Sequence, residues 1–480
     1  MPRRAEPGRA GRVGGPASVR VALTTWLARP LTSFHLVLAV FGLLTVLGLV
    51  MVYSASSIES LANGGTTYRV FQKQVIYCGV GLVLFWVALR VPPRVLRRLS
   101  PPALLAGVVL LILVLTPLGT DMGTDTRSWF RIGGVLSFQP VEFAKVALVL
   151  WGAHILVIKR AMLHQYRHLL VPLMPVALLM FTLVMMQPDL GGTIALGVIP
   201  LALLWFAGAP LRLFAGITLS AVSGALVLAT TANYRLDRIT GFLNPDDDPQ
   251  GANFQARQAL YALGEGGFFG KGLGRASAKW DYLPNVHNDF IFAIIGEELG
   301  FVGCVVVLGL FATLAYVGLR IAARNTDPWI RLVAATVTVW LVSQAAFNIG
   351  YVVGLLPVTG LTLPLISSGG TSVVTTMLVF GMLANFARHE PEAVSALRAQ
   401  GQDRFSRWLR LPMPDPYRPP ARRVRAPRSA APAGRPPLRA GRPTGAVGRM
   451  VVHPLDERRR GRRGAPPEQR RRGAAQGGQR

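Results

Sequence analysis

The sequence predicts an all-α polytopic membrane protein with about ten transmembrane helices. Long apolar runs recur along most of the chain, and 51% of its 480 residues are hydrophobic while only 15% are charged. A soluble domain carries roughly a quarter charged residues, so the composition excludes a water-soluble fold. Arginines gather at the two ends and in alternate loops, which is the distribution of a protein with a fixed orientation in a membrane.

Each predicted span is an apolar run of roughly 17 to 25 residues. The short apolar stretch at 361–368 is expected to be a re-entrant or interfacial segment. The first run is too long for a signal peptide and no small-residue cleavage site is evident, so we interpret it as the first span. The expected spans are 34–56, 71–91, 103–118, 138–158, 169–187, 192–207, 211–232, 290–322, 329–357 and 372–387. The two long stretches, the eighth and ninth spans, are each either one tilted helix or a broken one.

Charges in the loops predict the orientation. If both termini are cytoplasmic, the basic loops after the second, fourth and eighth spans all fall on the cytoplasmic side. The opposite side then receives a large loop, 233–288, between the seventh and eighth spans. The basic residues that set this orientation are Arg90, Arg94, Arg97, Arg98, Lys159, Arg160, Arg167, Arg320, Arg324 and Arg331.

The predicted domains are a basic N-terminal segment (1–33), a ten-helix membrane domain (34–390) and an arginine- and proline-rich tail (391–480). The tail has too few apolar residues to offset the entropy of ordering, so we expect it to be disordered. It is either a solvated segment near anionic headgroups or a docking arm for a cytoplasmic partner, and the two are compatible. Because the basic ends flank a hydrophobic body, we expect no nucleic-acid partner despite the net charge of +28.

Ionisable residues inside spans are costly, and they mark function or a buried pair. Glu142 and Lys145 stand three residues apart, on one face of the predicted fourth helix, where they can neutralise each other. A structural ion pair and a substrate-binding role both stay open. Asp189 lies at a tight turn between two spans, where it can cap the next helix or serve a functional role.

The stretch 283–292 carries the strongest signal for chemistry. His287 and Asp289 stand where the large loop enters the eighth span, so a carboxylate at the membrane boundary can act as a base. The alternative for Asp289 is a helix N-cap. Glu297 and Glu298 lie about two helical turns deeper and need partners or polar surroundings.

The glycine-rich stretch 264–274 fails the test for a phosphate-binding loop. Gly270-Lys271 has no glycine five residues earlier, no Ser or Thr follows the lysine, and no strand precedes it. A looser contact of Lys271 and backbone N–H groups with a pyrophosphate stays open. The sequence shows no cluster of His and Cys with metal-ligand spacing.

Several spaced blocks resemble the SEDS family of shape, elongation, division and sporulation proteins. Together they are far more specific than any one alone, and the resemblance covers 31–392. The chain is most similar to the septal, cell-division branch, and its long basic tail suggests an actinobacterial member; the elongation branch is the near alternative. The blocks are 51–56, 139–145, 187–191, 234–245, 287–300 and 364–372.

The resemblance implies a peptidoglycan glycosyltransferase of the bacterial inner membrane that polymerises lipid II at the division septum. It implies an undecaprenyl-pyrophosphate-linked glycan as donor and a class B penicillin-binding protein as partner. Other division proteins are expected to bind as well, through the basic tail. A divalent cation, Mg²⁺ or Mn²⁺, is implied by the family alone. A lipid II flippase and a non-catalytic division scaffold are the alternatives.

The resemblance also implies the site residues. Asp289 matches the family's essential aspartate and is the expected catalytic base. Two departures from the family pattern, Asn285 and Asn288, lie near it and bear on its tuning. A third is Ser137, where many members have an arginine. Substrate-binding roles are expected for Lys73, Gln139, Glu142, Lys145, Asp189, Lys271, His287, Glu298, Ser367 and Ser368.

The expected chemistry is formation of a β-1,4 link with inversion. It needs a base for the acceptor's 4-hydroxyl and positive charge at the departing pyrophosphate. Pyrophosphate is already a good leaving group, so one essential carboxylate is enough and a paired acid is not required. Candidate cations, besides a bound metal, are Lys73, Lys145, Arg127, Arg131 and Lys271.

Overall fold

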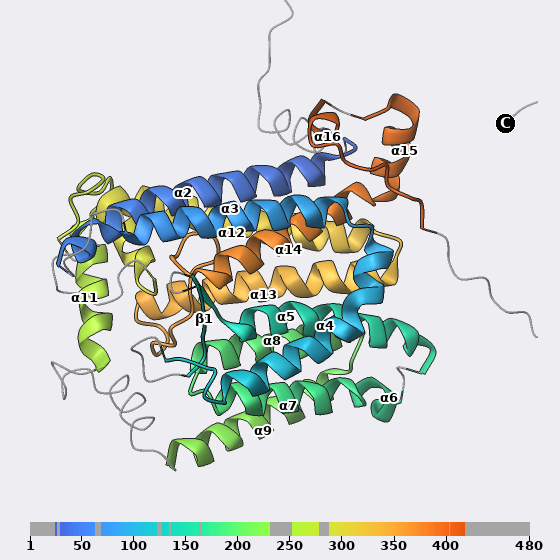
Figure 1. The fold of residues 1–480 in the computed structure, drawn as a ribbon, viewed down its shortest axis with the longest axis horizontal. Helices are drawn as coiled ribbons and strands as arrows, with labels where there is room; N and C mark the ends of the chain where they lie inside the picture. Colours follow the sequence, from blue (N-terminus) through green and yellow to red (C-terminus); the bar gives the residue numbers. More distant parts are fainter. Residues whose placement is uncertain are drawn as a thin grey trace, which may run out of the picture. The chain divides into compact units, whose positions relative to one another are not determined.

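The computed structural model describes Thr25 and residues 29–62, 69–121, 127–133, 136–162, 165–230, 252–277, 288–402 and 404–417. In these residues the chain forms a bundle of long helices that lie side by side (Figure 1). Those long and apolar enough to cross a membrane are α2 (Thr32–Ala62), α3 (Arg69–Arg90), α4 (Pro93–Val114), α5 (Pro140–Ile158), α12 (Ile291–Arg324), α13 (Pro328–Val352) and α14 (Thr371–Arg388).

Three shorter apolar helices complete the predicted spans in the described part of the chain. They are α7 (Leu173–Met185), α8 (Leu190–Phe206) and α9 (Leu211–Thr230). The all-α polytopic fold is therefore confirmed. Helices suit the interior of a lipid bilayer, because their backbone groups are hydrogen-bonded within one segment. The remaining short elements before α7 are η1 (Arg160–Met162) and α6 (Tyr166–Leu170).

Two span boundaries differ from their predicted positions. The third span begins at Pro93 instead of 103, and it keeps Pro101 and Pro102 inside the helix. Proline fits the first helical position, because its fixed φ suits the turn and no N–H is needed there. The predicted start at 103 was wrong because the arginines before it lowered the local hydropathy. The ninth span ends earlier than predicted, at Val352 instead of 357.

The eighth span is a broken helix. Gly300 has a φ of +69°, a left-handed conformation that interrupts α12 after nine helical residues. The ninth span is one continuous helix, α13. The break in α12 divides it into a short buried segment, 291–299, and a long segment that crosses the bundle.

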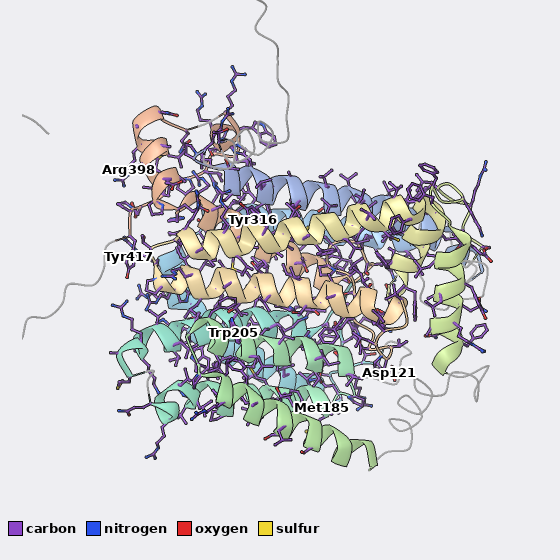
Figure 2. The ribbon with its side chains drawn as sticks, turned by 180° about the vertical axis from the view of Figure 1, so that it is seen from behind. Asp121, Met185, Trp205, Tyr316, Arg398 and Tyr417 are labelled. Carbon is purple, nitrogen blue, oxygen red and sulfur yellow. The ribbon has the colours of Figure 1, made fainter. Side chains whose placement is uncertain are left out.

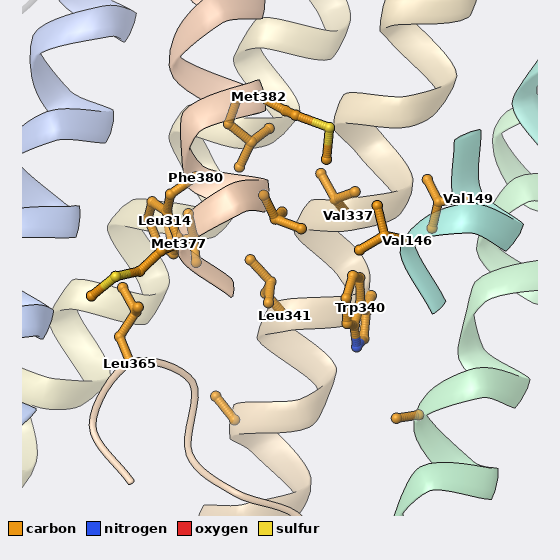
Figure 3. Close-up of a cluster of buried hydrophobic side chains, with 14 of the residues drawn as sticks. Val146, Val149, Leu314, Val337, Trp340, Leu341, Leu365, Met377, Phe380 and Met382 are labelled. Atoms are coloured by element: carbon orange, nitrogen blue, oxygen red, sulfur yellow. The ribbon is translucent and has the colours of Figure 1, made fainter. Parts of the chain in front are cut away.

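The core lies where α5, α12, α13 and α14 meet. Figure 3 shows Val146, Trp340, Leu314 and Phe380 converging there from these four helices. α14 also packs closely on α3, and α12 on α2. Burial of these side chains, together with close packing between helices, fixes the frame in which the polar residues stand.

The connection between α13 and α14 folds back into the bundle. Residues 353–370 contain no helix, yet Leu361, Leu363 and Ile366 are buried. A β-carbon at Gly48 of α2 would overlap the carbonyl oxygen of Leu365, so the two backbones are in direct contact. The prediction that 361–368 is not a span is confirmed.

The predicted tail boundary at 391 is too early. Residues 391–402 and 404–417 are folded and contain α15 (Pro391–Gln400) and α16 (Arg404–Trp408). Ala393, Val394 and Leu397 are buried, because their spacing gives α15 one apolar face despite the polar composition around it. Residues 418–480, to which the disorder prediction also applies, lie outside the described residues.

The two ends of the bundle carry different structures. α15 and α16 lie at one end and α11 (Ala252–Glu265), from the large loop, lies at the other (Figure 1). Figure 2 likewise shows Arg398 and Tyr417 at one end and Asp121 at the other. The rest of that loop, 231–251 and 278–287, lies outside the described residues. We refer to the end with α11 as the outer end.

Candidate functional site

A small hairpin positions the start of α5. β1 (Phe130–Ile132) pairs antiparallel with β2 (Leu136–Phe138). The backbone N–H of Ser137 donates to Tyr77 Oη at 2.7 Å, and the Tyr77 hydroxyl is 2.9 Å from the Ser137 carbonyl oxygen. Gln139 then donates its N–H to Thr371 Oγ1 at 3.0 Å. The small side chain at Ser137 therefore stands where α3, α5 and α14 meet.

Asp189 caps α8. Its Oδ1 accepts from the N–H of Gly192 at 2.7 Å, which confirms the capping prediction. Its Oδ2 accepts from Gln139 Nε2 at 3.0 Å. One carboxylate thus joins the starts of α5 and α8, and its two oxygens are held in fixed directions.

Glu142 and Lys145 form an ion pair within one turn of α5. Lys145 Nζ donates to Glu142 Oε1 at 2.9 Å, and Lys145 is only 1% exposed. The ammonium also lies 4.9 Å from the ring centroid of Trp340, where the ring face attracts a cation. Both charges act on Asp189. The structure therefore brings together Gln139, Glu142, Lys145 and Asp189, which we call the inner polar cluster.

Removing one member of the Glu142–Lys145 pair is expected to destabilise the protein strongly. Lys145→Met leaves an uncompensated buried carboxylate, a change that costs about 3–5 kcal/mol. The double variant Glu142→Gln/Lys145→Met is expected to recover much of this loss. Thermal unfolding in detergent measures it, with activity measured on the same samples. A stable but inactive double variant would assign the pair a substrate role, whereas an unchanged single variant would contradict the ion-pair interpretation.

Asp289 is held through its backbone. Asn348 Nδ2 donates to the Asp289 carbonyl oxygen at 2.9 Å, and Tyr351 Oη lies 2.8 Å from the same oxygen. These two side chains of α13 also contact the carbonyl oxygen of Leu361, at 2.6 and 2.8 Å. The N-cap of α12 is Phe290, so the capping interpretation of Asp289 is wrong. The Asp289 side chain is partly exposed.

The Asp289 carboxylate lies over Gly360. A β-carbon added at Gly360 would stand 3.7 Å from Asp289 Oδ2, and Gly360 has a φ of +73°. On the α8 side, a β-carbon at Gly191 would stand 2.8 Å from the Thr359 carbonyl oxygen. Gly191 is two residues after Asp189. Residues 359–360 therefore separate Asp289 from the start of α8 by a thin layer of backbone.

Ser367 and Ser368 belong to the same folded-back connection. Ser367 is buried and its Oγ accepts from the N–H of Leu363 at 2.7 Å, which closes a local turn. Ser368 is partly exposed. Trp340 Nε1 donates to Gln344 Oε1 at 3.1 Å, and Gln344 Nε2 donates to the Thr362 carbonyl oxygen at 2.9 Å. This chain of contacts links the connection to the Trp340 ring under Lys145.

The candidate cations differ in how far they are already paired. Lys73 is partly exposed on α3 and forms no ion pair with any described residue. Arg127 and Arg131 are exposed near the hairpin. Lys271 donates to Glu265 and, at 2.8 Å, to Glu297 Oε1. Two carboxylates thus balance the Lys271 charge, and its substrate-binding role stays a prediction.

Glu297 anchors the glycine-rich stretch. Besides Lys271, its Oε1 accepts from the N–H of Ser277 at 2.6 Å and from Ser277 Oγ at 2.7 Å. The backbones of the two segments are also hydrogen-bonded. Lys271 and Gly272 donate their N–H groups to the carbonyl oxygens of Glu297 and Glu298 at 2.9 and 3.0 Å. The broken turn of α12 thus finds its hydrogen-bond partners in residues 266–277, which we call the glycine loop.

Glycines make this contact possible. A β-carbon at Gly270 would overlap the carbonyl oxygen of Glu298, and one at Gly266 would overlap that of Gly296. Gly300 in turn faces the backbone N–H of Gly270. The glycine-rich composition is therefore explained by backbone approaching backbone. It does not form a phosphate loop.

Glu298 contacts α2. Ser54 Oγ lies 2.7 and 2.6 Å from the two carboxylate oxygens, and the N–H of Gly274 donates to the same hydroxyl at 3.1 Å. Glu298 is 1% exposed. The two adjacent glutamates thus point to different partners, one to the glycine loop and one to α2. A substrate-binding role for Glu298 stays a prediction.

Acid is expected to loosen the glycine loop. Hydrogen bonds from Lys271 and Ser277 hold the pKa of Glu265 below its ordinary value. The stability contributed by this carboxylate is therefore complete above its unfolded pKa of about 4.3 and is lost as pH falls through the lower folded value. Because Glu265 is half exposed, loop opening should rise only by roughly two- to fivefold.

Amide-exchange protection factors of residues 266–277 would measure this change. The variant Glu265→Gln should show no such pH step, since it lacks the titrating group. A step of equal size in that variant would contradict the assignment to Glu265.

Sequence reasoning missed several residues that hold the site. Asn348 and Tyr351, three apart in α13, fix the backbone of Asp289. Gln344 holds Thr362 in the folded-back connection, and Ser54 holds Glu298. A signal was available, because polar side chains at helical spacing inside an apolar span face the protein interior. His287 lies outside the described residues. Within the described ranges, no group of three His, Cys, Asp or Glu side chains could hold a metal.

Comparison with known proteins gives consistent matches. Residues 34–392 match the family described as cell cycle protein, FtsW/RodA/SpoVE. The "Probable peptidoglycan glycosyltransferase FtsW" of Mycobacterium tuberculosis is 50% identical over 425 residues, which are 87% of this chain and 81% of that protein. The stage V sporulation protein E of Bacillus subtilis is 38% identical, over 75% of this chain and 98% of that protein.

Two solved structures share the fold. One, "Structural coordination of polymerization and crosslinking by a peptidoglycan synthase complex", has a TM-score of 0.62 and 27% identity, covering 76% of this chain and 99% of that one. The rod shape determining protein RodA of Thermus thermophilus has a TM-score of 0.54 and 28% identity, with the same coverage. The family match at 34–392 includes the helices that carry the polar residues described above.

Proposed function

Since this chain belongs to the FtsW, RodA and SpoVE family of cell cycle proteins, we propose that it polymerises lipid II into peptidoglycan glycan strands during septal cell-wall synthesis. It is a polytopic membrane protein, and the relatives matched over most of its length are named peptidoglycan glycosyltransferases. The proposal extends to an inverting reaction with undecaprenyl pyrophosphate as the leaving group.

The observation that carries the proposal is the position of Asp289, which is partly exposed while its backbone is fixed. The carboxylate is partly exposed at the outer start of α12, while Asn348 and Tyr351 fix its backbone. A base must be held in place yet reach the substrate, and this arrangement meets both needs. We assign Asp289 to take the proton from the acceptor's 4-hydroxyl as that oxygen attacks the anomeric carbon of the donor.

The departing pyrophosphate needs positive charge. Lys73 is a candidate, because no described residue forms an ion pair with it, whereas Glu142 balances Lys145. Arg127 and Arg131 at the exposed hairpin are further candidates. Electrostatic stabilisation of developing charge commonly contributes more to the rate of such reactions than any other effect.

A divalent cation, Mg²⁺ or Mn²⁺, stays a prediction from the family. The described residues do not fit a site made of protein ligands alone, since they include no group of three suitable side chains. We therefore assign no step to a metal ion.

We further propose a class B penicillin-binding protein as partner and a position in the bacterial inner membrane, at the septum, with both termini cytoplasmic. The similar structure of a peptidoglycan synthase complex supports a partner of that kind. The predicted cytoplasmic loops carry the arginines, and α15 and α16 extend from the same end of the bundle. Other division proteins are expected to bind the tail beyond residue 417.

The test is polymerisation of purified lipid II by the full chain, reconstituted with its penicillin-binding protein partner, with the glycan products separated on gels. Glycan strands made by the wild type support the proposal. Absence of product from a folded, partner-bound protein would overturn it.

A lipid II flippase is the second candidate, because a buried ion pair and a broken helix also occur in transporters. Transport of labelled lipid II without any glycan product, dependent on Glu142 and Lys145 but not on Asp289, would favour it. A scaffold would show neither activity.

A further inference from the structure

Residues 409–412 are held on α3 and α14 through their backbone carbonyl oxygens. Trp86 Nε1 donates to the Leu409 carbonyl oxygen at 3.2 Å, and Arg90 Nε donates to that of Arg410 at 3.1 Å. Arg388 Nη2 donates to the Pro412 carbonyl oxygen at 3.0 Å. Leu411 is buried between these contacts. The segment has a fixed place at the end of the bundle.

Its outward face combines one large aromatic ring with cations. Trp408 is 76% exposed, and Arg404, Arg407 and Arg410 are exposed around it. Met413 is also exposed. Among the described side chains of 404–417 the one acid is Asp415, which lies 3.8 Å from Arg94. We call Arg404, Arg407, Trp408 and Arg410 the Trp408 face.

The Trp408 face adjoins an exposed apolar surface of α3. Apolar side chains of α3, including Val75, Val83 and Val87, are exposed along the length of the helix. Near the end of that strip, the Arg90 guanidinium lies 4.3 Å from the centroid of the Trp86 ring, and the Trp86 N–H donates to the Leu409 carbonyl oxygen. Tryptophan and arginine together are typical of the level at which hydrocarbon gives way to headgroups.

We infer that the Trp408 face binds anionic phospholipid headgroups of the leaflet on the predicted cytoplasmic side. The indole lies among the headgroups, and the guanidinium groups of Arg404 and Arg407 donate paired hydrogen bonds to the lipid phosphates. The positive charge and the continuity with the lipid-facing strip of α3 favour a lipid over a protein as occupant. The inference uses the proposed orientation and does not depend on the glycosyltransferase reaction.

Fluorescence quenching by brominated lipids tests the inference on the full chain. The protein is reconstituted in phosphatidylcholine nanodiscs that contain either brominated phosphatidylglycerol or brominated phosphatidylcholine at equal amounts. The chain has nine tryptophans, so the contribution of Trp408 is the difference between the wild type and Trp408→Phe. We expect this contribution to be quenched more strongly by the anionic lipid.

Arg404→Gln/Arg407→Gln should lose that preference, with apparent affinity for phosphatidylglycerol falling roughly tenfold. The matched control Arg212→Gln, which removes an exposed cation at the start of α9, should keep it. Thermal unfolding confirms that each variant is folded. Equal quenching by both lipids would overturn the headgroup preference, and no quenching by either would show that the face meets water or a protein. Lipid II polymerisation is measured separately, so a protein that fails to polymerise lipid II can still be tested for headgroup binding.

Discussion

Asp289→Asn is expected to abolish lipid II polymerisation while leaving the fold intact. Asparagine has the same shape, and the contacts of Asn348 and Tyr351 go to the backbone carbonyl oxygen, which the substitution does not change. What is lost is the ability to accept a proton, and a positioned base contributes roughly 10²–10⁴-fold to the rate. The rate of glycan formation at saturating lipid II should fall by this factor.

A carboxylate at the opposite end of the bundle provides the control. Glu392→Gln removes an exposed carboxylate that is 2.7 Å from Arg324 and far in sequence from the site. It should polymerise lipid II at the wild-type rate. Thermal unfolding should give the same midpoint for wild type and Asp289→Asn. An active Asp289→Asn protein would remove the base from the mechanism.

Gly270→Ala is expected to be among the most destabilising single-methyl changes in the protein. The new β-carbon would overlap the Glu298 carbonyl oxygen, and Gly270 has a φ of +80°, which disfavours any side chain. Backbone strain alone costs about 1–3 kcal/mol. Because backbone cannot move aside as a side chain does, we expect the glycine loop to detach from α12.

Gly264→Ala is the matched control. It lies six residues earlier, in α11, where a β-carbon would meet nothing within 4 Å. Alanine is also the better helix former there, so this variant should be neutral or slightly stabilising. Limited proteolysis of the outer loop and the thermal unfolding midpoint distinguish the two. Equal behaviour of the two variants would refute the close contact between the glycine loop and α12.

Local features were predictable because short-range physics decides them. The pairing of Glu142 with Lys145 follows from their spacing on a helix, and the cap at Asp189 follows from an acid at a turn before an apolar run. The apolar runs located every span, since length and hydropathy are properties of the segment itself.

Contacts between segments far apart in the chain could not be predicted from the sequence. The contact between Lys271 and Glu297 could not be predicted, because the two residues are 26 positions apart and meet only where α12 breaks at Gly300. The fold of residues 391–417 was missed for the same reason. Composition describes a segment in water, whereas Leu411 is buried against helices from earlier in the chain.

The thin layer of backbone at residues 359–360 has a consequence for the design of inhibitors. Asp289 lies on one side of this layer, and the start of α8 with Gly191 lies on the other. A compound bound beside Gly360 would therefore displace Asp289 and the inner polar cluster at the same time. Resistance by a bulkier residue at this position would be hard to acquire. The φ of +73° at Gly360 disfavours a side chain, and the added atoms would crowd the Asp289 carboxylate, which we propose as the base.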